Sequence, residues 1–228
     1  MNETIEKWLD DELSDYEQVF KEFRSKQQRM YYIWMAAAIA GMVALGFAVG
    51  YDWKYVAKVH LVIGLVIALI IWLCVLITNR AVTMKTVRKK FVKALEELSP
   101  DDREAFISQK FGKIDFMNTS DDSFPARLMV SEDYWFYFRG ACSIFKVGDI
   151  EKLGTRRETT RVNYSVGGAK VRQRIGIGVS ITVGYNQNTC SRDTRPDQIY
   201  LAKMEQLSAA QTLIQDNCKK AENLWTEN

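Results

Sequence analysis

Two apolar stretches decide the fold class of this chain: residues 30–50 read MYYIWMAAAIAGMVALGFAVG, and residues 59–78 read VHLVIGLVIALIIWLCVLIT. Neither stretch contains Asp, Glu, Lys or Arg. About 20 residues of α-helix cross the ~30 Å hydrocarbon core of a bilayer. The sequence therefore predicts a membrane protein with transmembrane helices over 30–50 and 59–78, joined by an outside loop over 51–58.

The basic residues near these stretches predict the orientation of the chain. Lys21, Arg24, Lys26 and Arg29 precede the first span, whereas the loop between the spans holds only two lysines. A second group follows the other span, and its members are Arg80, Lys85, Arg88, Lys89, Lys90 and Lys93. Because Lys and Arg are retained on the cytoplasmic side, we expect a multi-pass protein of the plasma membrane with cytoplasmic N- and C-termini. The residues after the second span are also candidates for contact with anionic lipid.

Small residues recur in both spans. Those of the first span are Ala36, Ala37, Ala40, Gly41, Ala44, Gly46, Ala48 and Gly50, and those of the second are Gly64 and Ala68. Small faces let membrane helices approach closely. Since the loop is short, we interpret these residues as the packing face of an intramolecular hairpin. The alternative is that they form a contact between copies of the chain or with a larger membrane complex.

The segments that flank the spans have helical periodicity. Residues 1–29 carry an acidic amphipathic helix, whose apolar positions are Ile5, Trp8, Leu9, Leu13, Tyr16, Phe20 and Phe23. A basic helix follows the second span, with apolar positions at Met84, Val87, Phe91, Leu95 and Leu98. Opposite charge favours their antiparallel pairing. Ser99 and Pro100 then begin a short helix that reaches about Lys110. We expect a cytoplasmic helical stalk over 79–112.

After a polar linker over 113–125 the periodicity changes towards two, which is typical of β-strands. Strands are predicted at 127–130, 134–138, 142–147, 159–166, 170–177, 179–185 and 198–203, with a hairpin turn at Gly167–Gly168. Helical spacing returns from Leu207 to Leu224. The predicted fold class is α+β: a two-helix transmembrane hairpin with a stalk, and an antiparallel β-rich domain over 126–228 capped by a C-terminal helix.

The sequence from Arg127 to Leu153 contains the phrases SEDYWFYFRG and VGDIEKL between predicted strands. In this order it resembles bacterial pleckstrin-homology-like domains on two-helix membrane anchors, including YcxB-like proteins. The resemblance implies a fold and a location, and it implies no active site. The chain departs from the pattern in a polar insert, Asn186 to Asp197, and it lacks the Lys/Arg pattern of phosphoinositide binding in the first loop between strands.

The residues that usually carry catalysis or bind metals are scattered. Cys74, Cys142, Cys190 and Cys218 lie far apart, and His60, the single histidine, is at the outer edge of the second span. Zinc sites need clustered ligands, and a nucleophile normally needs a positioned base. We expect no metal, no cofactor and no catalytic site. The glycines in Ile175–Gly178 are interpreted as a bulge or a tight bend, because the third glycine and the following helix of a dinucleotide site are missing.

Between Glu151 and Arg174 there are seven basic and two acidic residues. The candidate lipid or partner surface consists of Arg156, Arg157, Arg161, Lys170, Arg172 and Arg174. Such a surface beside an anionic inner leaflet is expected to dock on lipid headgroups; the alternative is a solvated strand edge protected by charge. The net charge of +3 and the membrane tether disfavour nucleic acid.

These patterns favour a non-enzymatic membrane-anchored module whose cytoplasmic domain binds a protein partner or the anionic inner leaflet. The alternative is an accessory subunit of a larger membrane complex, packed through the Ala/Gly face of the first span.

Overall fold

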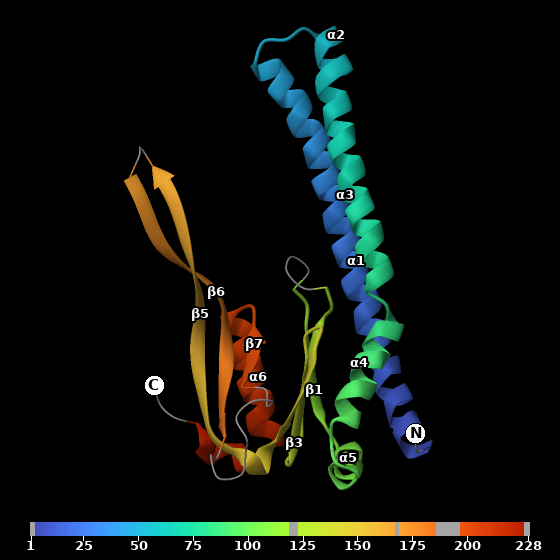
Figure 1. Ribbon diagram of the computed structural model, residues 1–228, viewed down its shortest axis with the longest axis vertical. Helices are drawn as coiled ribbons and strands as arrows, with labels where there is room; N and C mark the ends of the chain where they lie inside the picture. Colours follow the sequence, from blue (N-terminus) through green and yellow to red (C-terminus); the bar gives the residue numbers. More distant parts are fainter. Residues whose placement is uncertain (1–2, 119–122, 167–168, 186–196, 226–228) are drawn as a thin grey trace. The chain divides into compact units, whose positions relative to one another are not determined.

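The computed structural model describes residues 3–118, 123–166, 169–185 and 197–225 (Figure 1). It combines helices with antiparallel sheets and divides into two compact units. The helical unit comprises Met1–Lys89 and Thr119–Pro125, and the β unit comprises Lys90–Asn118 and Ala126–Asn228. The mixed α+β architecture agrees with the predicted fold class.

The helical unit is built on two long helices. Helix α1, Glu3–Ala48, joins the predicted amphipathic helix and the first span into one element of 46 residues. Helix α3, Leu61–Ala81, follows a short helix α2, Trp53–Tyr55, and a π-helical turn η1, Val56–His60. The predicted outside loop over 51–58 is therefore largely helical. Glu3–Ala48 and Trp53–Ile77 are each long and apolar enough to cross a membrane.

Two glycines mark close approaches in the helical unit: Gly46 of α1 meets the turn η1, and Gly64 of α3 meets α1. A Cβ atom on Gly46 would lie 2.9 Å from His60 Cγ, and one on Gly64 would lie 3.0 Å from the Cα of Ile39. Side chains larger than hydrogen at these positions would push the helices apart. Gly50, with φ of +89°, ends the first helix in a conformation that glycine adopts without strain.

The end of the helical unit away from the α1–α2 loop shows the expected charge pairing. Arg88 of helix α4, Met84–Glu96, donates to Glu6 at 2.6 Å and to Asp10 at 2.5 Å, and both carboxylates belong to α1. Where α3 ends, Arg24 Nη2 of α1 donates to the Val82 carbonyl at 2.6 Å. These contacts confirm the predicted attraction between the acidic and the basic helix.

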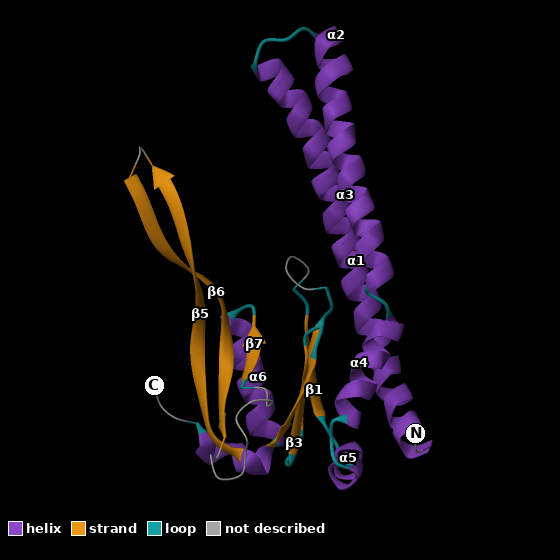
Figure 2. Ribbon diagram, in the orientation of Figure 1, coloured by secondary structure: helices purple, strands orange, loops and turns teal. Residues whose placement is uncertain are grey.

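The β unit contains two antiparallel sheets. The first has the order β1–β2–β3–β4, with strands Gly112–Phe116, Ala126–Val130, Tyr134–Phe138 and Cys142–Lys146. The second has the order β5–β6–β7, with strands Ile150–Val166, Ala169–Tyr185 and Gln198–Leu201 (Figure 2). A 3₁₀ turn η2, Val147–Asp149, links the sheets. Helix α6, Met204–Asn217, and a 3₁₀ helix η3, Lys219–Leu224, follow the strands.

Three strand predictions need correction. Strand β1 occupies the beginning of the predicted linker over 113–125, because Gly112–Phe116 pairs with β2 in full register. Strand β5 begins at Ile150, nine residues before the predicted Thr159. The segments predicted as 170–177 and 179–185 form one strand, β6, because a bulge changes the register without ending the pairing.

The main core lies between the two sheets and α6. It contains Trp135 and Phe145 from the first sheet, Leu153 and Ile181 from the second, and Ile214 from α6. Burial of this apolar surface is the largest favourable contribution to folding of the unit.

The opposite face of the four-stranded sheet is covered as well. The ring of Phe91 from α4 lies 4.8 Å from that of Phe136. The ring of Phe106 from helix α5, Pro100–Ile107, lies 5.7 Å from that of Tyr134. Strands β2 and β3 are thus buried along their whole length. The β unit begins at Lys90, so that the domain boundary predicted at residue 126 is too late.

Helix α5 is fixed by the predicted cap and by a network around one carboxylate. The Ser99 side chain accepts a hydrogen bond from the Asp102 backbone at 3.1 Å. Lys146 and Tyr134 donate to Asp102 Oδ1 at 2.6 and 2.9 Å. Hydrogen bonds from Lys146, Ser99 and Tyr134 lower the pKa of Asp102 to about 2. Burial, followed by the bond to Asp102, raises the pKa of Tyr134 to about 12.

Candidate interaction surface

The β5–β6 hairpin extends beyond the rest of its sheet. Strands β5 and β6 each have 17 residues, whereas β7 pairs only with Val179–Thr182. Residues 159–166 and 169–176, here called the hairpin arm, pair only with each other among the described residues. Figure 2 shows the arm projecting past β7 and α6 of the same unit. The residues of the predicted turn, Gly167–Gly168, lie outside the described residues.

A β-bulge marks the base of the arm. Glu158 pairs with Gly178, but Thr159 pairs with Gly176, which leaves Ile177 as the extra residue of β6. A side chain at Gly178 would collide with the hydroxyl of Tyr200 on β7. The glycine-rich step thus combines a bulge with a close approach, and the prediction of a bulge is confirmed.

The register divides the residues of the arm into two kinds of cross-strand pair. Successive pairs in an antiparallel ladder belong to opposite faces. One face, here called the basic face, has the pairs Arg161/Arg174, Asn163/Arg172 and Ser165/Lys170. The other, here called the apolar face, has the pairs Val162/Gln173, Tyr164/Val171 and Val166/Ala169. Four of the predicted surface residues therefore share one face of the arm.

The other two predicted residues lie below the bulge. Arg156 and Arg157 are exposed and pair with Ser180 and Val179. Because they are consecutive in a strand, they belong to opposite faces. Arg156 also lines an open pocket with Lys152, Thr182, Asp197 and Gln198. The pocket holds two cations and one carboxylate, without a nucleophile beside a base.

The apolar face of the arm was not part of the predicted surface, which was chosen from its Lys and Arg residues alone. Val162, Tyr164 and Val166 alternate strictly with Arg161, Asn163 and Ser165 along β5. This alternation is visible in the sequence, but its meaning depends on the register, because two strands must place their apolar residues in the same pairs.

The basic residues that follow the second span do not form one patch. Arg88 is held by Glu6 and Asp10, and the hydrogen bond to Asp10 is the main cause that raises its pKa. Lys90 donates to the carbonyl of Gly140, and Lys93 lies 3.9 Å from Glu97. The remaining three, Arg80, Lys85 and Lys89, are exposed.

The small residues of the spans separate into two groups. Gly46, Gly64 and Ala68 are buried; Gly46 lies against η1, and Gly64 lies at the contact between α3 and α1. The others are exposed, namely Ala36, Ala37, Ala40, Gly41, Ala44, Ala48 and Gly50. The prediction that the two helices pack through the row of alanines in α1 is therefore wrong, because these alanines are exposed. The alanines lie about four residues apart on a side of α1 that α3 leaves uncovered.

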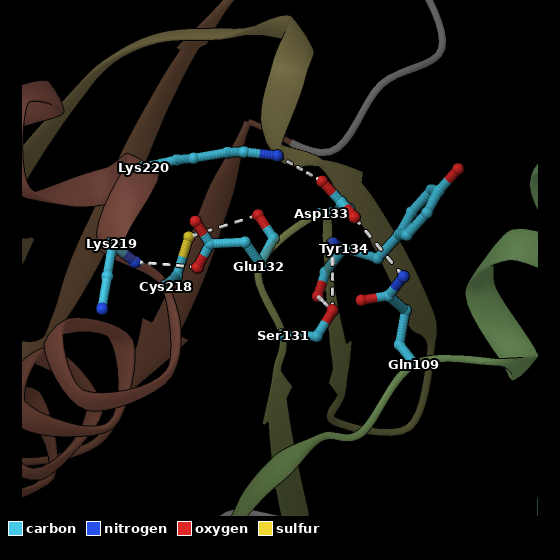
Figure 3. Close-up of polar contacts among 8 residues, drawn as sticks. All are labelled: Gln109, Ser131, Glu132, Asp133, Tyr134, Cys218, Lys219 and Lys220. Atoms are coloured by element: carbon cyan, nitrogen blue, oxygen red, sulfur yellow. Dashed lines mark hydrogen bonds and ion pairs between the residues drawn. The ribbon is translucent and has the colours of Figure 1, made fainter.

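A polar cluster at the β2–β3 turn is structural. Glu132 accepts from the Lys219 backbone at 2.9 Å, Lys220 forms an ion pair with Asp133, and Gln109 Nε2 donates to Asp133 at 3.4 Å (Figure 3). The Cys218 thiol lies 3.6 Å from the Glu132 carbonyl. These contacts fasten the end of α6 and the end of α5 to one turn.

The remaining cysteines and the histidine do not assemble. Burial raises the pKa of the Cys142 thiol to about 12 and also raises the pKa of Cys218. Cys74 is exposed on α3, and Cys190 lies outside the described residues. The ring of His60 lies 5.4 Å from that of Tyr51 and 5.9 Å from that of Tyr55. In the part of the chain that the structure describes, no three His, Cys, Asp or Glu residues could hold a metal ion.

Comparison of the chain with protein-family models, with curated proteins and with solved structures gives no match.

Proposed function

We propose that this protein is a non-enzymatic interaction module, anchored in the plasma membrane by α1 and α3, whose β unit lies in the cytoplasm and binds a partner through the hairpin arm. The apolar windows of the two helices support the anchor, since only 6% and 11% of their residues are buried. The excess of Lys and Arg at the ends away from the loop supports cytoplasmic termini.

The observation that carries this proposal is the two-stranded arm. A two-stranded ribbon is marginally stable in water, and independent stability needs a third strand or a packed helix. The arm has eight cross-strand pairs above the bulge, and its apolar and basic pairs alternate. A partner that covers one face of the arm would supply the packing that a third strand or a helix gives to the rest of the sheet.

The order of the elements supports assignment of the β unit to the pleckstrin-homology-like class. The resemblance implies strands followed by a closing C-terminal helix. The described strands form sheets of four and three, and α6 packs on strands from both. The resemblance implies no active site, which favours binding over catalysis.

Photo-crosslinking in native membranes tests the proposal. A photoreactive amino acid is placed at Tyr164 on the arm, and a control at Met204, which is 52% exposed at the start of α6. We expect a discrete adduct, to protein or to lipid, from position 164 and not from position 204. Equal labelling at both positions, or none at either, would contradict a role of the arm in binding.

A second candidate function is that of an accessory subunit in a larger membrane complex or a homo-oligomer. The observation that favours it is the exposed row of Ala36, Ala40, Ala44 and Ala48, because small faces promote close helix contact. Ala44→Leu is expected to reduce co-purification of a membrane partner, or self-association, by at least tenfold. Leu69→Ile, at an exposed position of α3, is the matched control and is expected to have no effect.

A further inference from the structure

We propose that the hairpin arm is an amphipathic β-ribbon that lies in the headgroup region of an anionic leaflet, with its apolar face towards the acyl chains and its basic face at the level of the phosphates. The inference rests on the proposed function and names the partner of the same surface as a lipid bilayer.

The first argument is the division of the arm into faces. An amphipathic helix with apolar residues on one side and Lys or Arg on the other sinks about 5–10 Å into the boundary between headgroups and acyl chains. The arm has the same division in strand form. Tyr164 pairs with Val171 on one face, and Asn163 pairs with Arg172 on the other. The bulge at Glu158 sets this division apart from the sheet below.

The second argument is charge. The sequence from Thr159 to Arg192 contains no Asp or Glu. Arg161 and Arg174 are direct cross-strand partners, and like charges in such pairs are destabilising. An anionic surface reverses that effect. Each Lys or Arg near an anionic leaflet strengthens binding about fivefold.

The third argument distinguishes a bilayer from a protein surface. An acidic protein patch would match the basic face but leave the apolar face in water, whereas the headgroup region offers phosphates and apolar chains along the whole length of the arm. The chain also carries two helices able to cross a membrane, so that a bilayer is always present at high local concentration.

The test uses the full-length protein reconstituted into vesicles. An environment-sensitive fluorescent amino acid is placed at Tyr164, on the apolar face, or at Asn163, its neighbour on the basic face. Vesicles contain phosphatidylcholine alone or with about 30% phosphatidylglycerol, each with brominated acyl chains as quencher. We expect strong quenching at position 164 in anionic vesicles only, weaker quenching at position 163, and loss of both in high salt.

Charge variants complete the test. R161Q with R174Q removes two basic residues and is expected to lower the ratio of bound to free arm about 25-fold. Lys152→Gln, an exposed position below the bulge, is the matched control and should leave the quenching unchanged. Position 164 unquenched in anionic vesicles, or quenched equally in both lipid mixtures, would overturn the inference. A protein adduct at position 164 together with absent quenching would retain the interaction module and exclude the lipid as its partner.

Discussion

Replacing Asp115 by Ala should destabilise the four-stranded sheet, because it removes a carboxylate that accepts two hydrogen bonds from the buried Arg127 guanidinium. The two residues are cross-strand partners on β1 and β2. Arg127 Nε donates to Asp115 Oδ1 at 2.7 Å, and its Nη2 donates to Oδ2 at 2.8 Å. Two parallel charge-assisted hydrogen bonds of this kind are among the strongest that side chains form.

The magnitude follows from the burial of the two partners. The Arg127 side chain is 1% exposed and that of Asp115 is 19% exposed. Removing the carboxylate breaks a buried charge pair, for which about 3–5 kcal/mol is typical. Replacing both partners by apolar residues, as in D115L with R127M, should cost less, because neither charge of the pair then remains to be desolvated.

Amide hydrogen exchange in the full-length protein measures this loss where it occurs. Since about 1.4 kcal/mol corresponds to a factor of ten, the amides of β1 and β2 should exchange at least 100-fold faster in D115A than in the unaltered protein. The double variant should restore most of the protection. A less than tenfold change in D115A, or a double variant as labile as the single one, would refute the electrostatic explanation.

Three further predictions concern other parts of the chain. Gly64→Leu should weaken the contact between α1 and α3 by about 1–3 kcal/mol, because a Cβ atom at this position would lie 3.0 Å from the α1 backbone. G41L is the control and should be tolerated, because nothing lies within 4 Å of a Cβ atom on Gly41. Thermal unfolding in detergent compares the two variants. The pKa of Asp102 is lowered to about 2 in the folded protein, so the ionised carboxylate stabilises the fold at any pH above the pKa of the unfolded chain. This contribution is lost as the pH falls towards 2. In urea titrations, D102N should therefore be less stable than the unaltered protein at pH 6 and about equally stable near pH 2. Burial raises the pKa of the Cys142 and Cys218 thiols, so iodoacetamide at pH 8 should label both only after unfolding. Mass spectrometry detects the label. Rapid labelling of the folded protein would contradict the described burial.

The features that the sequence predicts well are those with a long or sharply bounded pattern. The two long apolar helices can be predicted from composition and length alone. Strand β3, Tyr134–Phe138, was predicted with the observed bounds, because turn residues flank a run of aromatic side chains. The cap at Ser99 was predicted for a similar reason, since Pro and two acids follow it directly.

The errors arise where tertiary contacts decide the structure. Strand β1 has five residues, too few for a clear alternation, and its pairing with β2 defines it. Phe91 was assigned to a stalk seam, although its ring packs on the β3 strand, because a helical stripe does not reveal what covers it. In the arm, the predicted strands and two-residue turn agree with the observed pairs, whereas at the base of the arm the extra residue Ile177 changes the register, and its place cannot be read from propensity.

The packing of α4 and α5 on the four-stranded sheet affects the synthesis of the β unit and its transfer by genetic recombination. Phe91 and Phe106 lie in helices that leave the ribosome before any strand of the sheet, so the apolar cover is already synthesised when β2 and β3 emerge. A genetic crossover at residue 126 would transfer the strands without that cover and expose Phe136. A unit that keeps its apolar cover therefore begins at Lys90, within helix α4.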